Sequence, residues 1–413
     1  MLARVRFGAK TQPVNIAKDF SASHRFSADA PWSLDAIGLL IFEMIVPWLG
    51  LKEQKRADAP TWLAGDDTLA RKRGLKVFGV GMHHDPILSR RPKAITHWGR
   101  SWVVLGVIVR FPLWPARAFC LLNLFRPYLN HDAAARHRGV PRTRLDLAVE
   151  MLYSLCRTGP NRRFHVVADA GYGGQSAHNR RPKNCDLTSR LLLTARLYAA
   201  PPTRRSGTNG RPRRRGLRLP TPAQMLFRQG GWTPRASPVE LNLYGPSDRV
   251  RLYETIAHCY SASTTPLRIA AVEAVHGGRA RQAFYSTSGT PSAAEVLEAY
   301  SLRWSLEVAF HDGKQSLGFV EPPDWSQRAV ERAAPMARLL FTLTVLWFVC
   351  TGRRDCRQLE PPRYTTKREP SFAHTLGTLR RASRREQMLS WGLRGPGSQQ
   401  VLELLEDTTH LAA

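Results

Sequence analysis

The chain has 413 residues, and 61 Lys and Arg against 32 Asp and Glu give it a formal net charge of +29. Hydrophobic residues make up 43% of the sequence, which is enough to bury a core and excludes a chain that is disordered throughout. Gly (30) and Pro (29) follow no period, which excludes a collagen-like protein. A charge excess of this size favours a polyanionic partner, with nucleic acid first and an anionic membrane second.

The sequence argues against a membrane partner. Its two most apolar stretches are residues 36–51, which contain Glu43 and Pro47, and residues 339–350. Both are shorter than the run of about 18 apolar residues that a spanning helix needs. The first residues, MLARVRFGAK, lack the apolar core of a signal peptide. The six cysteines are widely spaced and include no CxxC pair, so we expect a reduced cytoplasmic protein without structural zinc.

The first part of the chain is predicted to change from helix to strand. Residues 1–60 are expected to be helical, centred on residues 32–50. Three strand-like runs follow, each rich in β-branched or aromatic residues and bounded by turn residues: residues 61–64, 76–84 and 101–111. The pair His83-His84 before Asp85 invites a metal reading, but a turn before Pro86 is the favoured interpretation.

A helix and a buried strand come next. Residues 143–158 carry apolar residues at helical spacing. Residues 164–174, FHVVADAGYGG, are expected to form a buried strand that stops at Asp169 and turns on its glycines. Residues 191–198 are a candidate for another strand. Strands alternating with a helix in this order predict an α/β fold.

Residues 200–290 differ from what precedes them. Residues 201–220 are mainly Arg, Pro and Gly and are predicted to form a loop, and alternating patterns after them predict a β-rich insertion. Thr290-Pro291 is a suitable helix start, with an N-cap residue before Pro. We expect that helix to continue to about residue 315, and the remaining residues to be mostly helical and basic.

This last helix carries a pattern of polar residues, Tyr300-x2-Arg303-x3-Glu307-x6-Lys314. At about 100° per residue, the four side chains lie along one narrow stripe of the helix. Cations beside a carboxylate and a phenol suit a site that holds a metal and binds phosphates. The alternative is a solvated charged stripe whose Arg–Glu pair contributes only a few tenths of a kcal/mol, about 0.3.

The pattern resembles the C-terminal signature of a group of bacterial insertion-sequence transposases in the DDE superfamily, in which Trp often follows the Arg, as Trp304 does here. Two upstream elements are similar to motifs of the same group. Asp66-Asp67-Thr68 looks like its Asp-x-Thr element, and Asp169-Ala170-Gly171-Tyr172 like its Asp-x-Gly-Tyr element.

The resemblance implies an RNase H-like core, a mixed sheet whose first and fourth strands lie side by side. Asp66, Asp169 and Glu307 are then the catalytic and metal-binding acids, with Asp67 as the alternative to Asp66. Two Mg²⁺ ions, for which Mn²⁺ substitutes, would activate and stabilise the reacting oxygens, and such hard cations take oxygen ligands.

The resemblance also implies DNA contacts. Tyr300, Arg303 and Lys314 are expected at phosphates near the cut. The loop after residue 200 is similar to minor-groove hooks, although phosphate binding without base preference is the favoured reading; its candidate residues are Arg211, Arg213, Arg214 and Arg215.

The implied domain plan has five parts. They are a helical N-terminal region that is a candidate for a shortened DNA-recognition domain, the first part of the core, the Arg-rich loop with the β-rich insertion, the helix that completes the core and a basic helical C-terminal region: residues 1–60, 61–199, 200–290, 291–325 and 326–413.

The implied activity is that of a bacterial transposase near the nucleoid. It would cut the ends of an insertion sequence at terminal inverted repeats and join each 3′-OH to target DNA, as a homodimer on paired ends. Two alternatives remain at this point: an RNase H-like nuclease without strand transfer, and a decayed relative that only binds DNA.

Overall fold

The computed structural model describes residues 31–49, 59–85, 88–89, 93–115, 117–203, 213, 215–226, 238–242, 247–263, 265–275, 280–319, 325–355 and 369–390. The chain divides into two compact units. One comprises residues 33–343, and the other comprises residues 1–32 together with 344–413. The sheet and the candidate site lie in the unit of residues 33–343.

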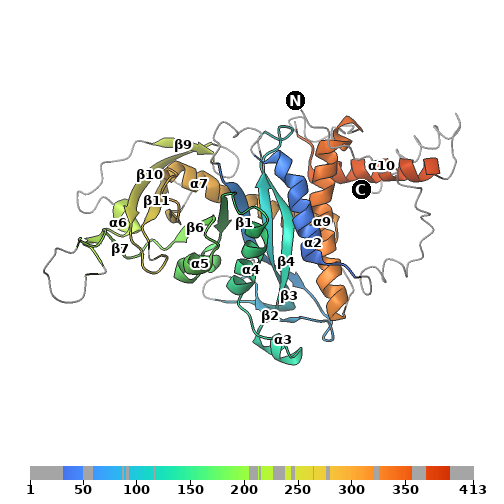
Figure 1. Ribbon diagram of the computed structural model, residues 1–413, viewed down its shortest axis with the longest axis horizontal. Helices are drawn as coiled ribbons and strands as arrows, with labels where there is room; N and C mark the ends of the chain where they lie inside the picture. Colours follow the sequence, from blue (N-terminus) through green and yellow to red (C-terminus); the bar gives the residue numbers. More distant parts are fainter. Residues whose placement is uncertain are drawn as a thin grey trace. The chain divides into compact units, whose positions relative to one another are not determined.

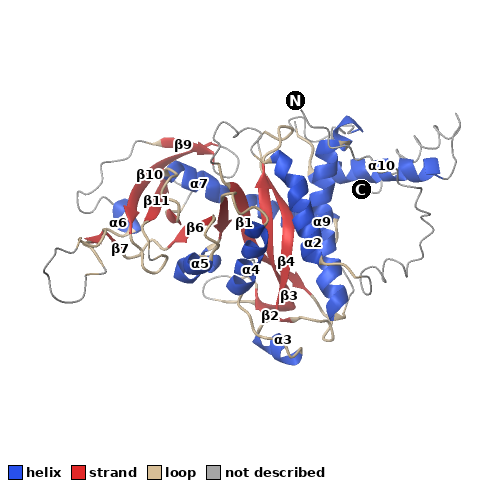
Figure 2. Cartoon of the chain, viewed as in Figure 1, coloured by secondary structure: helices blue, strands red, loops and turns tan. Residues whose placement is uncertain are grey.

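One mixed sheet forms the frame of this unit (red strands in Figure 2). Among the described residues its strand order is β2-β3-β1-β5-β6-β12-β11-β10-β9, and β4 pairs with β3. The first six strands are β1 (Thr61–Arg71), β2 (Gly81–His84), β3 (Thr96–Val109), β4 (Phe119–Tyr128), β5 (Phe164–Ala168) and β6 (Cys185–Leu191). The later strands are β9 (Val239–Asn242), β10 (Ser247–Ala257), β11 (Leu267–Ala274) and β12 (Gln282–Ser286), while β7 (Leu197–Tyr198) and β8 (Arg218–Leu219) form a separate pair.

The centre of the sheet has the arrangement expected of an RNase H-like core. β1 is antiparallel to β3 on one side and parallel to β5 on the other, and β5 is parallel to β6. The first strand therefore lies beside the strand that ends just before Asp169. The predicted α/β class with a mixed sheet is confirmed.

Helices cover both faces of the sheet (Figure 1). Gly65 and Val166 face α4, whereas the residues next in line along the strands face the opposite side, because side chains alternate along a strand. Arg126 on β4 links two helices on the α4 side, since it pairs with Asp35 of α2 at 2.6 Å and with Glu150 of α4 at 2.8 Å. The helices are α2 (Leu34–Ile45), α3 (His131–Arg136), α4 (Arg144–Arg157), α5 (Gly174–Arg180), α6 (Pro222–Leu226), α7 (Ala293–Ser301), α8 (Trp304–Ser316), α9 (Gln327–Cys350) and α10 (Phe372–Ser390).

The helix predicted for residues 143–158 is confirmed as α4. Of the helical region predicted for residues 1–60, the centre contains α2, while residues 1–30 and 50–58 lie outside the described residues. Thr143 caps α4 in a capping box with Asp146, so that each side chain accepts a backbone N–H of the other residue. β1 is longer than the run 61–64, because pairing with β3 continues through the polar residues to Arg71.

One predicted strand was wrong, and one strand was not predicted. Residues 191–198 do not form one strand: β6 ends at Leu191 and the short β7 begins at Leu197. β4 was not predicted, although seven of its ten residues are buried. It pairs with β3 through a register shift at Leu105/Gly106.

The helix after the insertion starts later than predicted. Ser292, not Thr290, is the N-cap, since its Oγ accepts the Glu295 N–H at 3.3 Å and the Glu295 carboxylate accepts the Ser292 N–H at 2.8 Å. The helix is also not continuous, because α7 and α8 are separated at Leu302 and Arg303. Here the hydroxyl of Ser301 donates to Glu298 O and that of Ser305 to Leu302 O, which competes with backbone bonds and tightens the turn.

The strands of the β-rich segment extend the same sheet. β12 pairs with β6 over four residue pairs, Thr188↔Ser286 to Leu191↔Ala283. α7 packs on one face of this extension, against Phe284, Val272 and Leu241. The β-rich segment is therefore joined to the core by backbone hydrogen bonds, not only by its connecting loops.

α9 is the only described helix that is long and apolar enough to cross a membrane, and 56% of its most apolar window is buried. The core helix of a soluble protein meets the same test, so the finding is weak support for a membrane span. The helix is longer than the apolar stretch noted in the sequence, because of its residues only 339–350 were counted there as apolar.

Candidate active site

Asp66 and Asp169 lie on neighbouring parallel strands at matching positions. The ladder between β1 and β5 ends at the pair Gly65↔Ala168, and the next residues along the two strands are Asp66 and Asp169. By the alternation of side chains, both point away from α4, toward α7 and α8. β1 continues past this point while β5 stops, so Asp66 lies in the middle of a strand and Asp169 at the end of one.

Arg303, between α7 and α8, joins the first and third acids. Its Nη1 lies 2.5 Å from Asp66 Oδ2, and its Nη2 lies 2.5 Å from Glu307 Oε1. The three side chains are between 17% and 33% exposed, so the site is partly open to solvent. One guanidinium thus holds together two carboxylates that are 241 positions apart in the sequence.

Tyr300 brings Asp169 into the same group. Its hydroxyl donates to Asp169 Oδ1 at 3.5 Å, a long hydrogen bond, and its ring lies 5.7 Å from the Arg303 guanidinium carbon. The ring packs on Phe284 of β12 at a centroid distance of 4.6 Å. The structure therefore brings Tyr300, Arg303, Glu307, Asp66 and Asp169 together.

The electrostatics of the site reflect this crowding of charge. The pKa of Asp66 is raised from 3.8 to about 6, mainly by burial and also by the neighbouring Asp67 and Asp169 carboxylates, while Arg303 and the Asp67 N–H oppose the shift. Burial lowers the pKa of Arg303, but the charges of Asp66, Tyr300, Glu307 and Asp169 outweigh burial and raise it overall. Arg303 therefore stays charged among acids.

Lys314 lies apart from this group. Burial lowers its pKa, Arg338 and Arg71 lower it further, and Asp85 opposes the shift. Asp85 is buried and accepts hydrogen bonds from Arg71 and from the Leu88 N–H, which is consistent with the turn predicted there. Lys314 is therefore subject to the charges of Arg338, Arg71 and Asp85, and among the described residues no hydrogen bond or ion pair joins it to the acids.

The Arg-rich loop is described only in part. Arg211 and Arg214 lie outside the described residues, whereas Arg213 and Arg215 are exposed. The guanidinium carbon of Arg215 lies 5.2 Å from the ring of Tyr198 and 5.1 Å from that of Tyr260.

Asp67 points to the other face of the sheet from Asp66. It accepts a hydrogen bond from the Tyr172 hydroxyl at 2.9 Å and one from Ser101 at 3.3 Å, and it pairs with Arg144 at 3.2 Å. This polar cluster was not predicted from the sequence. Strand alternation could have separated the two aspartates, had residues 61–71 been recognised as one strand.

Family comparisons agree with this geometry. The family model described as DDE superfamily endonuclease matches residues 9–235, which is more than half of the chain. The chain belongs to the DDE superfamily. A second model, described as Transposase DDE domain, matches residues 146–340, so the DDE assignment covers both aspartates and Glu307. No curated protein matches the chain.

The donors of this DDE-superfamily protein suit a divalent cation in their chemistry. Asp66, Asp169 and Glu307 offer hard carboxylate oxygens, which Mg²⁺ prefers, and two of them, Asp66 and Glu307, already pair with one positive group, Arg303. Within the described part of the chain, no three His, Cys, Asp or Glu residues form a ready-made metal cluster. In the structure Arg303 supplies the positive charge between the acids.

Proposed function

We propose that this DDE-superfamily protein is a DNA transposase that cuts the ends of an insertion sequence and joins the freed 3′-OH to target DNA. The observation that carries the proposal is the convergence of three distant parts of the chain: Asp66 and Glu307 pair with Arg303, and Tyr300 joins Asp169 to them. These acids would hold Mg²⁺ or Mn²⁺, which supplies charge stabilisation for phosphodiester hydrolysis and transfer.

The chain's own residues have separate tasks in this proposal. Asp66, Asp169 and Glu307 present oxygen ligands along one edge of the site. Arg303, with its planar fork of donors, binds two oxygens of a DNA phosphate when it leaves its acidic partners. Tyr300 orients Asp169 through its hydroxyl. Lys314 and the exposed Arg213 and Arg215 bind the DNA backbone more remotely.

The partners follow from the activity. The substrate is double-stranded DNA with terminal inverted repeats, and the product step needs target DNA. A homodimer on paired ends supplies the two active sites that joining two ends requires. The net charge of +29 supports binding to a polyanion, and a cytoplasmic location near the nucleoid fits such a substrate.

A cleavage assay tests the proposal. The substrate is a linear duplex that carries the repeats flanking the coding region, incubated with Mg²⁺ and either the wild type or Asp169→Asn. We expect the wild type to cut the duplex and the variant to bind it with unchanged affinity without cutting. Asp132→Asn, the same charge change on exposed α3, serves as the control and should cut normally.

A second assay distinguishes the transposase from a nuclease. A pre-cut end with a free 3′-OH is mixed with a target plasmid and Mg²⁺, and joined product is measured. Joining supports the transposase, whereas cleavage without joining identifies a nuclease. A wild type that binds DNA but neither cuts nor joins it would identify a relative that only binds DNA.

A further inference from the structure

We infer that Asp67 and Tyr172, on the α4 side of the sheet, form a positioning pair that holds the Asp169 loop against the strand that carries Asp66. The inference rests on the proposed function, since it assigns a role to two residues outside the group of acids. In this inference neither residue contacts DNA or metal. Asp67 acts through Asp66, and Tyr172 acts through Asp169.

Tyr172 and Asp67 are in direct contact. The Tyr172 hydroxyl donates to Asp67 Oδ1 at 2.9 Å, and Tyr172 is only 6% exposed. Burial raises the pKa of Tyr172, and the Asp67 carboxylate raises it further, so the phenol keeps its proton and donates it. Arg144 at 3.2 Å and Ser101 at 3.3 Å bind the other oxygen of Asp67 and fix its orientation.

Each partner is linked to a catalytic acid. The backbone N–H of Asp67 donates to Asp66 Oδ1 at 2.8 Å, so the position of Asp67 sets the orientation of the Asp66 carboxylate. The backbone N–H of Tyr172 donates to Asp169 O at 2.9 Å, which closes one 3₁₀ turn from Asp169 to Tyr172. A shift of Tyr172 therefore shifts the backbone of Asp169.

The Tyr172–Asp67 contact lies just past the end of the pairing between β1 and β5. Backbone pairing between β1 and β5 stops at Gly65↔Ala168, directly before the two acids. Past this point, the Tyr172–Asp67 hydrogen bond joins the β1 strand to the loop after β5. It therefore controls the spacing of Asp66 and Asp169 where the sheet no longer does.

Other contacts hold the same loop from the far side. The Ser189 hydroxyl donates to Asp169 O at 3.1 Å, and the Gly174 N–H donates to the Tyr285 hydroxyl oxygen at 2.9 Å. Because these contacts remain, loss of the Tyr172 hydroxyl should change the spacing of the acids without unfolding the loop. This makes Tyr172→Phe a usable test.

The experiment compares Tyr172→Phe, Asp67→Ala and Asp67→Asn with the wild type. For Tyr172→Phe we expect kcat for DNA cleavage to fall about tenfold, in line with loss of one hydrogen bond to a charged group. KM for DNA should stay constant, and the Mg²⁺ concentration for half-maximal rate should rise. Asp67→Asn keeps an oxygen that accepts from Tyr172, so it should lose less activity than Asp67→Ala.

Two further readouts separate positioning from simple stability. The double variant Asp67→Ala/Tyr172→Phe should be little worse than Asp67→Ala alone, because both remove the same contact. Mn²⁺ affinity, measured by electron paramagnetic resonance, should fall in Tyr172→Phe. The control is Tyr153→Phe, which removes a hydroxyl from exposed Tyr153 on α4 and should change neither value.

The outcomes are distinct. Wild-type kcat and Mn²⁺ affinity in Tyr172→Phe, or fully additive losses in the double variant, would overturn the positioning pair while leaving the transposase proposal intact. A wild type that neither cleaves DNA nor binds Mn²⁺ would overturn the proposed function, and the positioning role with it. A lower melting temperature with unchanged kcat would also contradict the inference.

Discussion

In the proposed site Asp66 is a charged metal ligand, but its burial favours the uncharged form. A carboxylate in the middle of a strand, with a pKa of about 6, is costly to keep charged at neutral pH. Arg303 offsets only part of that cost. Sites of this kind are stable only because the surrounding fold supports them, and they often mark function.

Asp66→Asn should therefore stabilise the protein at high pH. The folded-state pKa of Asp66, about 6, lies above the ordinary value of 3.8, so the folded state binds more protons between these values and wild-type stability falls as pH rises through that window. Above it, the penalty reaches about 3 kcal/mol. Urea unfolding at pH 8 should show the variant as more stable, and the gain should disappear below pH 4. An equal gain at both pH values would contradict the assigned pKa.

Substitution of Arg303 should lower the free energy of unfolding, whereas Asp66→Asn should raise it at high pH. Arg303→Ala leaves Asp66 and Glu307 without their shared cation, and we expect the free energy of unfolding to fall by about 2 kcal/mol. Saturating Mg²⁺ should stabilise this variant more than it stabilises the wild type, because a bound cation restores the missing charge. Thermal unfolding with and without Mg²⁺ measures both effects.

Arg142→Ala is the matched control for Arg303→Ala. Arg142 pairs with Glu150 and is 44% exposed, so its loss should cost less than about 1 kcal/mol, as for surface pairs. Mg²⁺ should not distinguish this variant from the wild type. Equal Mg²⁺ stabilisation of all three proteins would argue against a cation site between Asp66 and Glu307.

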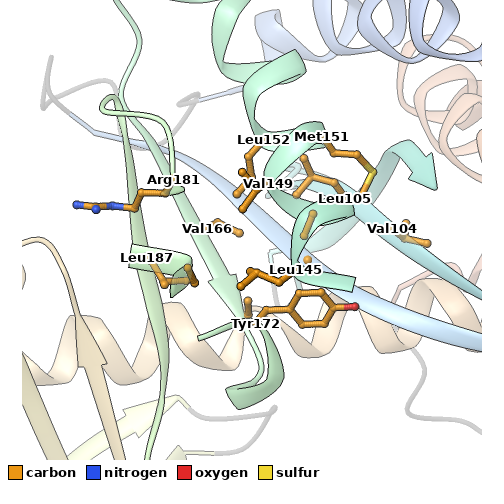
Figure 3. Close-up of a pocket in the computed structure, with 14 residues that line it drawn as sticks. Val104, Leu105, Leu145, Val149, Met151, Leu152, Val166, Tyr172, Arg181 and Leu187 are labelled. Carbon is orange, nitrogen blue, oxygen red and sulfur yellow. The ribbon is translucent and has the colours of Figure 1, made fainter. Parts of the chain in front are cut away.

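At the scale of elements, Gly65 stands directly before Asp66 in the middle of β1. Gly65 lines a mostly apolar pocket between the sheet and α4 (Figure 3). A Cβ at Gly65 would make only ordinary contacts, at 3.8 Å from Leu105 and 3.9 Å from Val166. The strand therefore has room for a larger residue there.

Gly65→Ala should stabilise the protein by about 0.5–1 kcal/mol, because alanine restricts the unfolded chain and fills part of the pocket. Gly106→Ala on β3 is the contrasting variant. Its Cβ would lie 2.5 Å from Cys120 Sγ and 3.0 Å from Leu121 O, so it should destabilise the protein. Chemical denaturation of both variants measures the difference, and loss of stability in Gly65→Ala would show that the pocket is not available space.

The elements show which patterns the sequence reveals. α4 was predictable because its apolar spacing and its Thr143 cap act locally. The run 61–64 underestimated β1, because Asp66 and Asp67 are polar residues in the part of the strand past Gly65, where among the described strands β1 pairs only with β3. The break at Leu302 was not predictable from periodicity, because the spacing of Tyr300, Arg303, Glu307 and Lys314 stays helical across it; in the structure the hydroxyls of Ser301 and Ser305 donate to backbone carbonyls there.

At the scale of the whole molecule, charge should dominate affinity for DNA. With a net charge of +29, we expect binding to an unrelated duplex to weaken by about a thousandfold or more between 50 and 200 mM salt, as for a protein with 6–10 phosphate contacts. Filter binding across salt concentrations gives the slope. Asp169→Asn should leave that slope unchanged. A slope near zero would show that the excess charge lies away from the bound DNA.

The sequence also predicted the main plan of the molecule. Three acids in the order Asp66, Asp169 and Glu307 were identified from motifs, and the fold brings them together. The Asp67–Tyr172 contact and the separation of Lys314 from the acids were not predictable, because both depend on which face of an element meets which neighbour.

The order of the acids has a consequence during synthesis. Glu307 and Arg303 emerge from the ribosome only after both aspartates and the strands β9–β12. A nascent or truncated chain that ends before α8 would carry much of the basic sequence but lack the third carboxylate. In the proposed transposase, such a chain would therefore lack the set of acids needed for cutting.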